Sequence, residues 1–155
     1  MGEEGRDERV TGGCQCGSVR FEATELLDDA HVCHCRMCQK ATGNLFAPLV
    51  GVPDAAIVWT GTPAEFDSSE MAARGFCRDC GTPLYYRPKG SGQVSIMIGC
   101  FDDPAPHLLR WQSGGESRLP QVRQLATLPP PGVTEDEMAD DAARIRASNR
   151  QHPDQ

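Results

Sequence analysis

Short runs of apolar residues, several of them alternating with polar residues, make up most of this chain. Around residues 18–22, Val19 and Phe21 alternate with polar neighbours, as in a strand with one buried face. Further apolar runs of strand length occupy residues 45–52, 57–59, 84–86 and 94–98. Because glycine and proline separate these runs, the pattern predicts a mainly β fold of short strands and hairpins.

Turn-forming residues refine this prediction at three places. Pro48 interrupts the run 45–52 and has no N–H to donate to a neighbouring strand, which predicts an edge strand or a bulge there. The glycines and proline of residues 88–92 separate two strand-like runs and predict a hairpin. Ser68 and Ser69 are expected in a turn region.

The end of the chain has a different pattern, because the prolines and glycine of residues 129–132 break any regular structure. Thr134 followed by Glu137 then has the form of a helix N-terminus, with arginines toward the other end. The predicted terminal helix has a thin apolar side, made only of Met138, Ala142 and Ile145. We therefore expect a solvated appendage without catalytic importance.

Composition is that of one compact domain. The 155 residues are 39% hydrophobic and 24% charged, and the net charge of −7 argues against nonspecific binding to nucleic acid. No stretch approaches the length of a membrane span, and residues 1–9 lack the apolar core of a signal peptide, so we expect a cytoplasmic protein. The expected division is a flexible N-terminus (1–10), a zinc-binding β domain (11–128) and a C-terminal linker with a helix (129–155).

Seven of the eight cysteines fall into three tight clusters. These are Cys14 with Cys16, then Cys33, Cys35 and Cys38, then Cys77 with Cys80. Closely spaced cysteines in a short chain favour zinc, which takes four protein ligands in a structural site and three in a reactive one. Seven ligands therefore divide into four and three.

The two distant pairs are expected to form the structural site, because a metal that joins distant segments stabilises a small domain. The sequence from Cys77 to Gly81 has the form of a zinc knuckle. The middle cluster is close enough for one turn to bring its three sulfurs onto a second ion. Residues 36–42 are the one short helical candidate in the body of the chain, with Cys38 in the first turn.

Two other interpretations of the cysteines are open. Disulfide bonds are disfavoured by the reducing compartment expected above. Alternatively, both sites are structural, with His34 or a more distant side chain completing the second one. His34 lies between two ligating cysteines and would have difficulty turning to the same ion. Cys100 ends an apolar run and is expected to be a small buried hydrophobic residue rather than a ligand.

Three motifs, in residues 13–21, 33–43 and 68–84, together resemble the glutathione-dependent formaldehyde-activating enzyme family, which includes the centromere protein V group. The resemblance runs from about residue 11 to 104. It implies a mostly β fold of the Mss4-like superfamily with two zinc ions. It also implies structural zinc at Cys14, Cys16, Cys77 and Cys80, and catalytic zinc at Cys33, Cys35 and Cys38.

The activity implied by the resemblance is that of a carbon–sulfur lyase. Its substrate is a thiol–aldehyde adduct such as S-hydroxymethylglutathione, formed from formaldehyde and glutathione, so small-molecule partners are expected. His34, Arg36 and Lys40 are candidates to donate hydrogen bonds near the metal or to attract a substrate carboxylate, and the alternative for each is a solvent-facing side chain, which is the expectation for Lys40. The segment 107–115 departs from the family pattern, because its tryptophan comes early and two glycines follow. The alternative function is a noncatalytic zinc-stabilised binding module.

Overall fold

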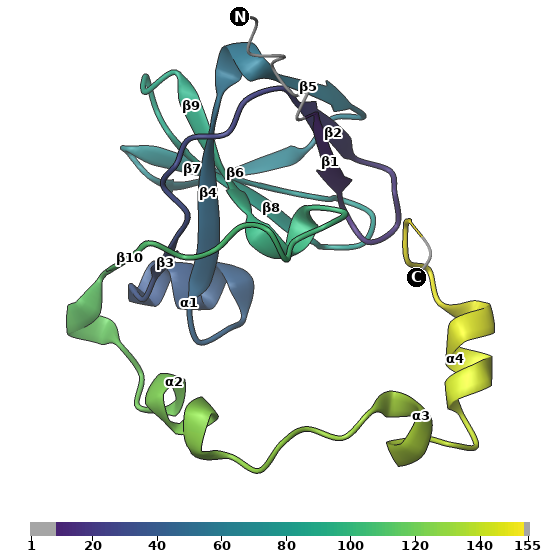
Figure 1. The fold of residues 1–155 in the computed structure, drawn as a ribbon. Helices are drawn as coiled ribbons and strands as arrows, with labels where there is room; N and C mark the ends of the chain where they lie inside the picture. The colour runs from purple at the N-terminus through teal and green to yellow at the C-terminus, as the bar shows by residue number, and fades with distance from the viewer. Residues whose placement is uncertain (1–8, 154–155) are drawn as a thin grey trace, which may run out of the picture.

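The computed structural model describes residues 9–153, and in that part ten strands form two sheets (Figure 1). The mainly β fold expected from the sequence is therefore confirmed. The strands are β1 (Val10–Gly13), β2 (Arg20–Ala23), β3 (His31–Cys33), β4 (Ala47–Pro53), β5 (Ile57–Thr60), β6 (Ala64–Ser69), β7 (Ala72–Phe76), β8 (Pro83–Pro88), β9 (Gln93–Met97) and β10 (Trp111–Ser113). The predicted N-terminal segment 1–10 lies outside the described residues except for its last two.

The smaller sheet has the order β1-β2-β5, with antiparallel pairing throughout. The predicted alternation is present here, because Val19, Phe21 and Ala23 are buried while the residues between them are half-buried. The pairing of β2 with β5 sets Phe21 opposite Trp59, and the two rings meet edge to face with centroids 5.5 Å apart. One face of this sheet therefore supplies aromatic rings to the core.

The larger sheet has the order β10-β3-β4-β9-β8-β7-β6, and its pairs are antiparallel except for the parallel pair β3 and β10. The expectation that Pro48 marks an edge or a bulge is wrong, because β4 lies between β3 and β9. The ladder between β4 and β9 begins at Leu49, one residue after Pro48. The missing N–H of Pro48 is therefore not required for a hydrogen bond to β9. For this reason a proline is tolerated here in an internal strand.

The predicted hairpin around residues 88–92 is confirmed by the pairing of β8 with β9. The turn predicted at Ser68 and Ser69 is misplaced, because both residues belong to β6 and the chain turns at Glu70 and Met71. β6 is an edge strand whose residues are mostly exposed. It therefore needs no buried apolar face, and the hydrophobic pattern does not reveal it.

The apolar faces of the two sheets meet in one core. Trp59 of the small sheet lies 5.4 Å from Tyr85 of the large sheet, measured between ring centroids. The Tyr85 ring in turn covers Gly75 on the adjacent strand β7, where an added Cβ would lie 2.2 Å from ring atoms. Only glycine leaves room for this ring, so the Gly75 position is required by packing between distant segments.

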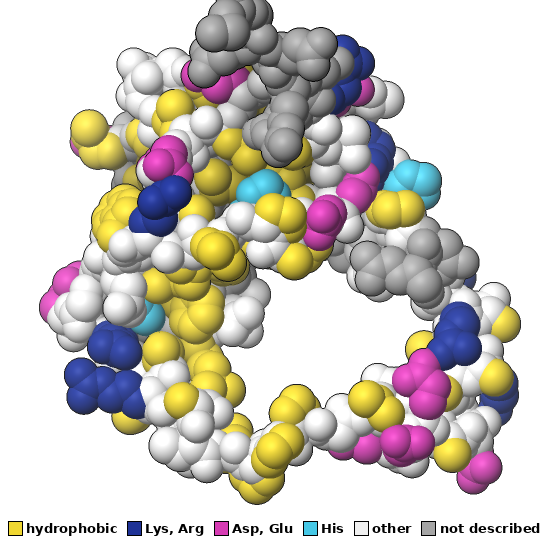
Figure 2. Space-filling model, viewed as in Figure 1, with side chains coloured by type: hydrophobic (Ala, Val, Ile, Leu, Met, Phe, Trp, Pro, Cys, Tyr) yellow, Lys and Arg dark blue, Asp and Glu magenta, His cyan; other side chains and the backbone are white. Residues whose placement is uncertain are grey.

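Four α-helices occur in the described part: α1 (Arg36–Thr42), α2 (Gln121–Gln124), α3 (Thr134–Glu137) and α4 (Ala142–Ser148). Short 3₁₀ turns are η1 (Asp54–Ala56), η2 (Ile98–Cys100), η3 (Gly115–Ser117) and η4 (Leu125–Thr127). After η3 the chain forms an arm that stands away from the β body, with open space between them (Figures 1 and 2). The arm returns at its end, where the His152 N–H donates to the Gln15 carbonyl. No helix in the described part is long and apolar enough to cross a bilayer.

The expected single terminal helix is wrong in detail, because two short helices take its place. The N-cap is Val133 rather than Thr134, and the helix stops where Met138 leaves helical geometry with φ −127° and ψ 43°. Met138 and Ile145 are each 44% exposed, so neither side chain finds a core to pack against. Short helices without such packing are marginal in water, which accounts for the break.

Candidate metal centres

The two distant cysteine pairs lie together at one end of the β body, as the four-cysteine cluster of Cys14, Cys16, Cys77 and Cys80. The first pair follows β1, and the second pair sits in the turn between β7 and β8. All four sulfur atoms lie within 4.8 Å of one another. The Cys16 sulfur lies 3.6 Å from that of Cys14 and 3.8 Å from that of Cys77.

These distances can be compared with the geometry of zinc. A tetrahedral site with Zn–S bonds of about 2.3 Å places its sulfurs about 3.8 Å apart. The four-cysteine cluster therefore fits a tetrahedral ion held entirely by protein. Nearby polar groups face its sulfurs, since the Val19 N–H donates to the Cys14 sulfur and the Thr82 hydroxyl lies 3.2 Å from the Cys80 sulfur. That zinc binds here remains a prediction.

The remaining three residues, Cys33, Cys35 and Cys38, form the three-cysteine cluster, and their sulfurs also lie within 4.8 Å of one another. Cys33 ends β3, Cys35 is the N-cap of α1, and Cys38 lies in the first turn of that helix. The Cys38 N–H donates to the Cys35 sulfur over 3.3 Å, so the cap itself orients one sulfur. The helix has the bounds predicted from the sequence, and Gly43 ends it with φ 61°.

Burial and hydrogen bonds act differently on the thiols of this cluster. Burial raises the pKa of Cys38 to about 12, and a hydrogen bond from Arg74 acts in the opposite direction. Burial also acts to raise the pKa of Cys35, but the Cys38 N–H and the neighbouring thiols outweigh it and lower that pKa. A buried thiol gives up its proton when a dication coordinates it, so this donor set suits a soft metal such as zinc.

His34 does not belong to the three-cysteine cluster. Its side chain is fully buried, and its Nε2 lies 2.8 Å from Oε1 of Gln112. The ring also meets Phe46 edge to face with centroids 5.8 Å apart. Within residues 9–153, no further His, Cys, Asp or Glu ligand atom joins the three sulfurs at this spacing. The cluster thus has three protein donors and a fourth direction without one.

The other two polar candidates, Arg36 and Lys40, lie on the helix that carries Cys38. Arg36 is exposed and donates to Oε1 of Gln39 over 2.5 Å, while Lys40 is exposed on the outer side of α1. Gln39 is buried and donates to the carbonyls of His34 and Ser117. Its role is to tie α1 to the segment that follows β10.

A residue that the sequence analysis did not single out, Arg74, does reach the three-cysteine cluster. It lies on β7 and is only 7% exposed, and its Nη2 donates to the Cys38 sulfur over 3.5 Å. The available signal was a charged residue inside the otherwise uncharged strand 72–76. Cys100, by contrast, is buried, belongs to neither cluster, and donates its S–H to the Pro83 carbonyl.

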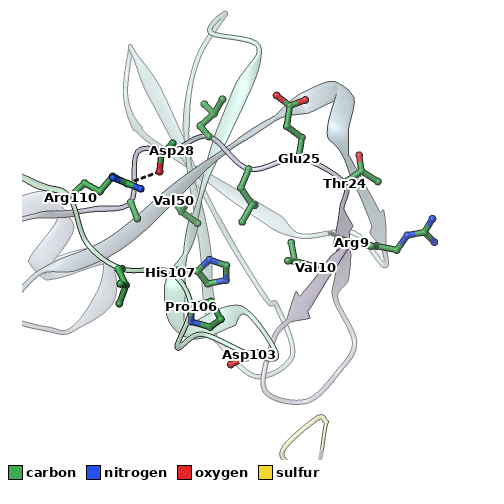
Figure 3. A pocket seen from close by; sticks show the side chains of 14 residues that line it. Arg9, Val10, Thr24, Glu25, Asp28, Val50, Asp103, Pro106, His107 and Arg110 are labelled. Atoms are coloured by element: carbon green, nitrogen blue, oxygen red, sulfur yellow. Dashed lines mark ion pairs between the residues drawn. The ribbon is translucent and has the colours of Figure 1, made fainter. Parts of the chain in front are cut away.

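Two cavities differ in their relation to Arg74, and neither is lined by any of the seven clustered cysteines. The larger, about 770 Å³, does not include Arg74 in its lining. Figure 3 shows Val50 and His107 facing this hollow and the ion pair of Asp28 with Arg110 beside it. The smaller cavity, about 300 Å³, includes Arg74 in its lining. Its other lining residues are Ala41, Phe66, Gly75, Phe76, Gly81, Pro83, Tyr85 and Met97.

Comparisons with known proteins give a family and several relatives. The family model described as "Glutathione-dependent formaldehyde-activating enzyme" matches residues 9–113. Relatives from Phaeosphaeria nodorum (36% identical over 89 residues) and Penicillium rubens (34% over 79) are each named "Putative glutathione-dependent formaldehyde-activating enzyme". The matches cover 52% and 48% of this chain and 47% and 41% of those proteins, so the chain spans about half the length of the curated relatives it matches.

Two further similarities concern a named activity and the fold. A Schizosaccharomyces pombe protein named as an uncharacterized lyase is 27% identical over 75 residues, which cover 48% of this chain and 55% of that protein. The crystal structure of a Rhodobacter sphaeroides protein superposes with a TM-score of 0.51 at 23% identity, covering 65% of this chain and 98% of that one. The structural likeness supports the fold alone.

Proposed function

The chain belongs to the glutathione-dependent formaldehyde-activating enzyme family, and we propose that it is a zinc-dependent carbon–sulfur lyase. The proposed substrate is a thiol–aldehyde adduct such as S-hydroxymethylglutathione. In the lyase direction the carbon–sulfur bond breaks, the hydroxyl proton is transferred to sulfur, and formaldehyde and the free thiol leave. The reverse direction adds the thiol to formaldehyde.

The observation that carries this proposal is the unequal number of donors in the two cysteine clusters. Four sulfurs close the four-cysteine cluster, and the proposal assigns it a structural zinc. Three sulfurs make up the three-cysteine cluster, with no fourth His, Cys, Asp or Glu ligand among residues 9–153, and the proposal assigns it the catalytic zinc. A reactive site needs such a free position, whereas a purely structural site does not.

Cys33, Cys35 and Cys38 would hold the catalytic zinc, which when bound supplies a Lewis acid and a position for the substrate sulfur. Three thiolates around a dication carry a formal charge of −1, which weakens polarisation of a carbonyl. We therefore assign the main contribution to positioning, because holding the two reacting atoms together lowers the entropic part of the barrier.

The residues around the smaller cavity suit the rest of this substrate. Phe66, Phe76 and Pro83 offer apolar surface, and Arg74 is the one charged residue in the lining. A cavity of about 300 Å³ lies at the lower end of the range found for small-molecule sites. In the proposal these side chains exclude water from the adduct and orient its thiol-bearing arm.

The proposal is tested by comparing Cys35→Ser with Cys80→Ser. Zinc content is measured by mass spectrometry under native conditions, folding by circular dichroism, and adduct formation by NMR exchange between formaldehyde and glutathione. We expect Cys35→Ser to stay folded, retain one zinc and lose catalysis. We expect Cys80→Ser to unfold, because structural zinc binding is coupled to folding.

Cys100→Ser is the matched control, since this buried cysteine lies outside both clusters and serine keeps a donor for the Pro83 carbonyl. It should bind two zinc ions and retain the wild-type rate. A Cys35→Ser protein that catalyses adduct formation at the wild-type rate would refute the enzyme proposal. A folded wild type with two zinc ions and no catalysis would instead favour the noncatalytic binding module.

A further inference from the structure

Arg74 is a buried cation with an unusual set of partners. Its Nε donates to the Ser68 hydroxyl over 3.0 Å, and its Nη2 donates to the Cys38 sulfur over 3.5 Å. The guanidinium carbon lies 5.0 Å from the centre of the Tyr86 ring, on which the group stacks. The remaining nitrogen, Nη1, is buried without a hydrogen-bond partner.

No carboxylate in residues 9–153 forms an ion pair with Arg74. A buried charge without an opposite charge is costly, so such arginines are normally paired. Neither the serine hydroxyl nor the tyrosine ring carries a negative charge. Among the contacts of Arg74 within residues 9–153, Cys38 can therefore supply a counter-charge, as a thiolate.

Arg87, on the neighbouring strand β8, shows the ordinary arrangement. Its guanidinium carbon also lies 5.0 Å from a tyrosine ring centre, that of Tyr85. It forms ion pairs with Asp54 at 3.3 Å and Glu65 at 3.2 Å. The two arginines thus share the stacking contact and differ in the anion that they face.

We propose that Arg74 is the counter-charge and positioning residue of the three-cysteine metal site, an inference that rests on the zinc assignment under Proposed function. Three thiolates and a dication carry −1, and the guanidinium makes the group neutral. The hydrogen bond fixes the direction of the Cys38 sulfur and draws charge away from it. Groups that hydrogen-bond to metal ligands in this way commonly change metal affinity 10- to 100-fold.

Arg74 also relates the metal site to the small cavity, because it contacts Cys38 and lines the cavity. The proposal therefore places a fixed positive charge between the thiolates and the substrate. Lysine would keep the charge but not the two-pronged contact with Ser68 and Cys38, because an ammonium group is a point donor. Charge and geometry can thus be separated by substitution.

The test compares Arg74→Gln, Arg74→Lys and the control Arg87→Gln in the full chain loaded with two metal ions. Zinc affinity is measured by competition with a chromophoric chelator. Cobalt is then substituted, and the sulfur-to-cobalt charge-transfer absorption is recorded. We expect Arg74→Gln to lower the binding affinity for one of the two zinc ions about 10- to 100-fold and to shift the cobalt absorption. Arg74→Lys should have an intermediate effect, and Arg87→Gln none.

A second comparison identifies the affected site. In a Cys35→Ser background the three-cysteine site is already lost, so Arg74→Gln should change the affinity of the remaining metal no further. The proposal would be overturned if Arg74→Gln bound both zinc ions with wild-type affinity. It would also be overturned if the substitution lowered the zinc affinity of both sites equally. If Arg74→Gln does not fold, the test rests on Arg74→Lys. Wild-type zinc affinity and an unshifted cobalt absorption in Arg74→Lys would then overturn the proposal.

These readouts do not involve catalysis, so the two proposals fail separately. A protein that binds two metals and depends on Arg74 for one of them, yet forms no adduct, refutes only the lyase. A protein that forms the adduct while Arg74→Gln leaves metal affinity and cobalt absorption unchanged refutes only the role of Arg74.

Discussion

Replacing Asp102 with asparagine tests the ion pair and hydrogen bonds that join the β1–β2 hairpin to the turn after β9. Both Asp102 oxygens accept hydrogen bonds from Arg20, at 2.8 and 2.5 Å, and one also accepts from the Thr11 hydroxyl at 2.6 Å. The Arg20 and Asp102 side chains are only 22% and 23% exposed, so solvent screens the pair weakly. Cys14 and Cys16 of the four-cysteine cluster lie in the loop of this hairpin.

The size of the effect follows from the hydrogen bonds lost. Asparagine keeps one oxygen acceptor but loses the charge, and a hydrogen bond to a charged group contributes about 1.5–3 kcal/mol. We expect a loss of about 2 kcal/mol, which lowers the urea midpoint by about 1 M for a slope of about 2 kcal/mol per M. Asp67→Asn is the control. Its ion pair with Lys89 joins side chains that are 74% and 44% exposed, so less than about 1 kcal/mol is expected.

The pH dependence gives a second check. Hydrogen bonds from Arg20 hold the pKa of Asp102 below its ordinary value. A carboxyl with a depressed folded-state pKa stabilises the protein above its unfolded pKa, about 3.9, and this contribution is lost as pH falls through the folded value. The difference between wild type and Asp102→Asn should therefore be equal at pH 8 and pH 9, both well above the ordinary pKa values of a carboxyl group and of an imidazole. Equal midpoints for the two proteins, or a difference that changes between these pH values, would refute the reasoning.

Two further substitutions test the core and the three-cysteine cluster. Leu84→Ala removes a fully buried side chain from β8 and should cost about 2–5 kcal/mol in urea unfolding, whereas a loss below about 1 kcal/mol would mean that the site is loosely packed. Gly114→Ala places a Cβ 2.7 Å from the Cys35 backbone nitrogen at a position with φ +67°. We expect the variant to bind one zinc less firmly while the other is retained, as measured by chelator competition, and two unchanged affinities would contradict this.

The predictions that succeeded concern short-range patterns. The bounds of α1, residues 36–42, could be predicted because its helical pattern is local and Gly43 stops it. The buried face of β2 and the hairpin between β8 and β9 likewise depend on neighbouring residues. The grouping of cysteines into four and three followed from ligand number, and the structure brings the same residues together. The metal at each cluster stays a prediction.

The predictions that failed depend on neighbours that are distant in sequence. Pro48 is tolerated in an internal strand because the ladder with β9 starts just beyond it. The hydrophobic pattern did not predict β6, because an edge strand can be polar. The predicted terminal helix is interrupted at Met138, and Met138 and Ile145 of its apolar side are exposed. The division at residues 10 and 128 remains a prediction.

The amino-acid sequence by itself determined which cysteines are available in two sets, the short strands, and a seven-residue helix that carries part of one set. These properties depend on residue type and on spacing within a few positions. Only the tertiary structure decided that Arg74 is buried against Cys38, that His34 turns toward Gln112, and that no His, Cys, Asp or Glu of residues 9–153 joins the three sulfurs. Burial, charge pairing and the set of side chains around the three sulfurs arise where distant segments pack together, and local sequence does not specify those contacts.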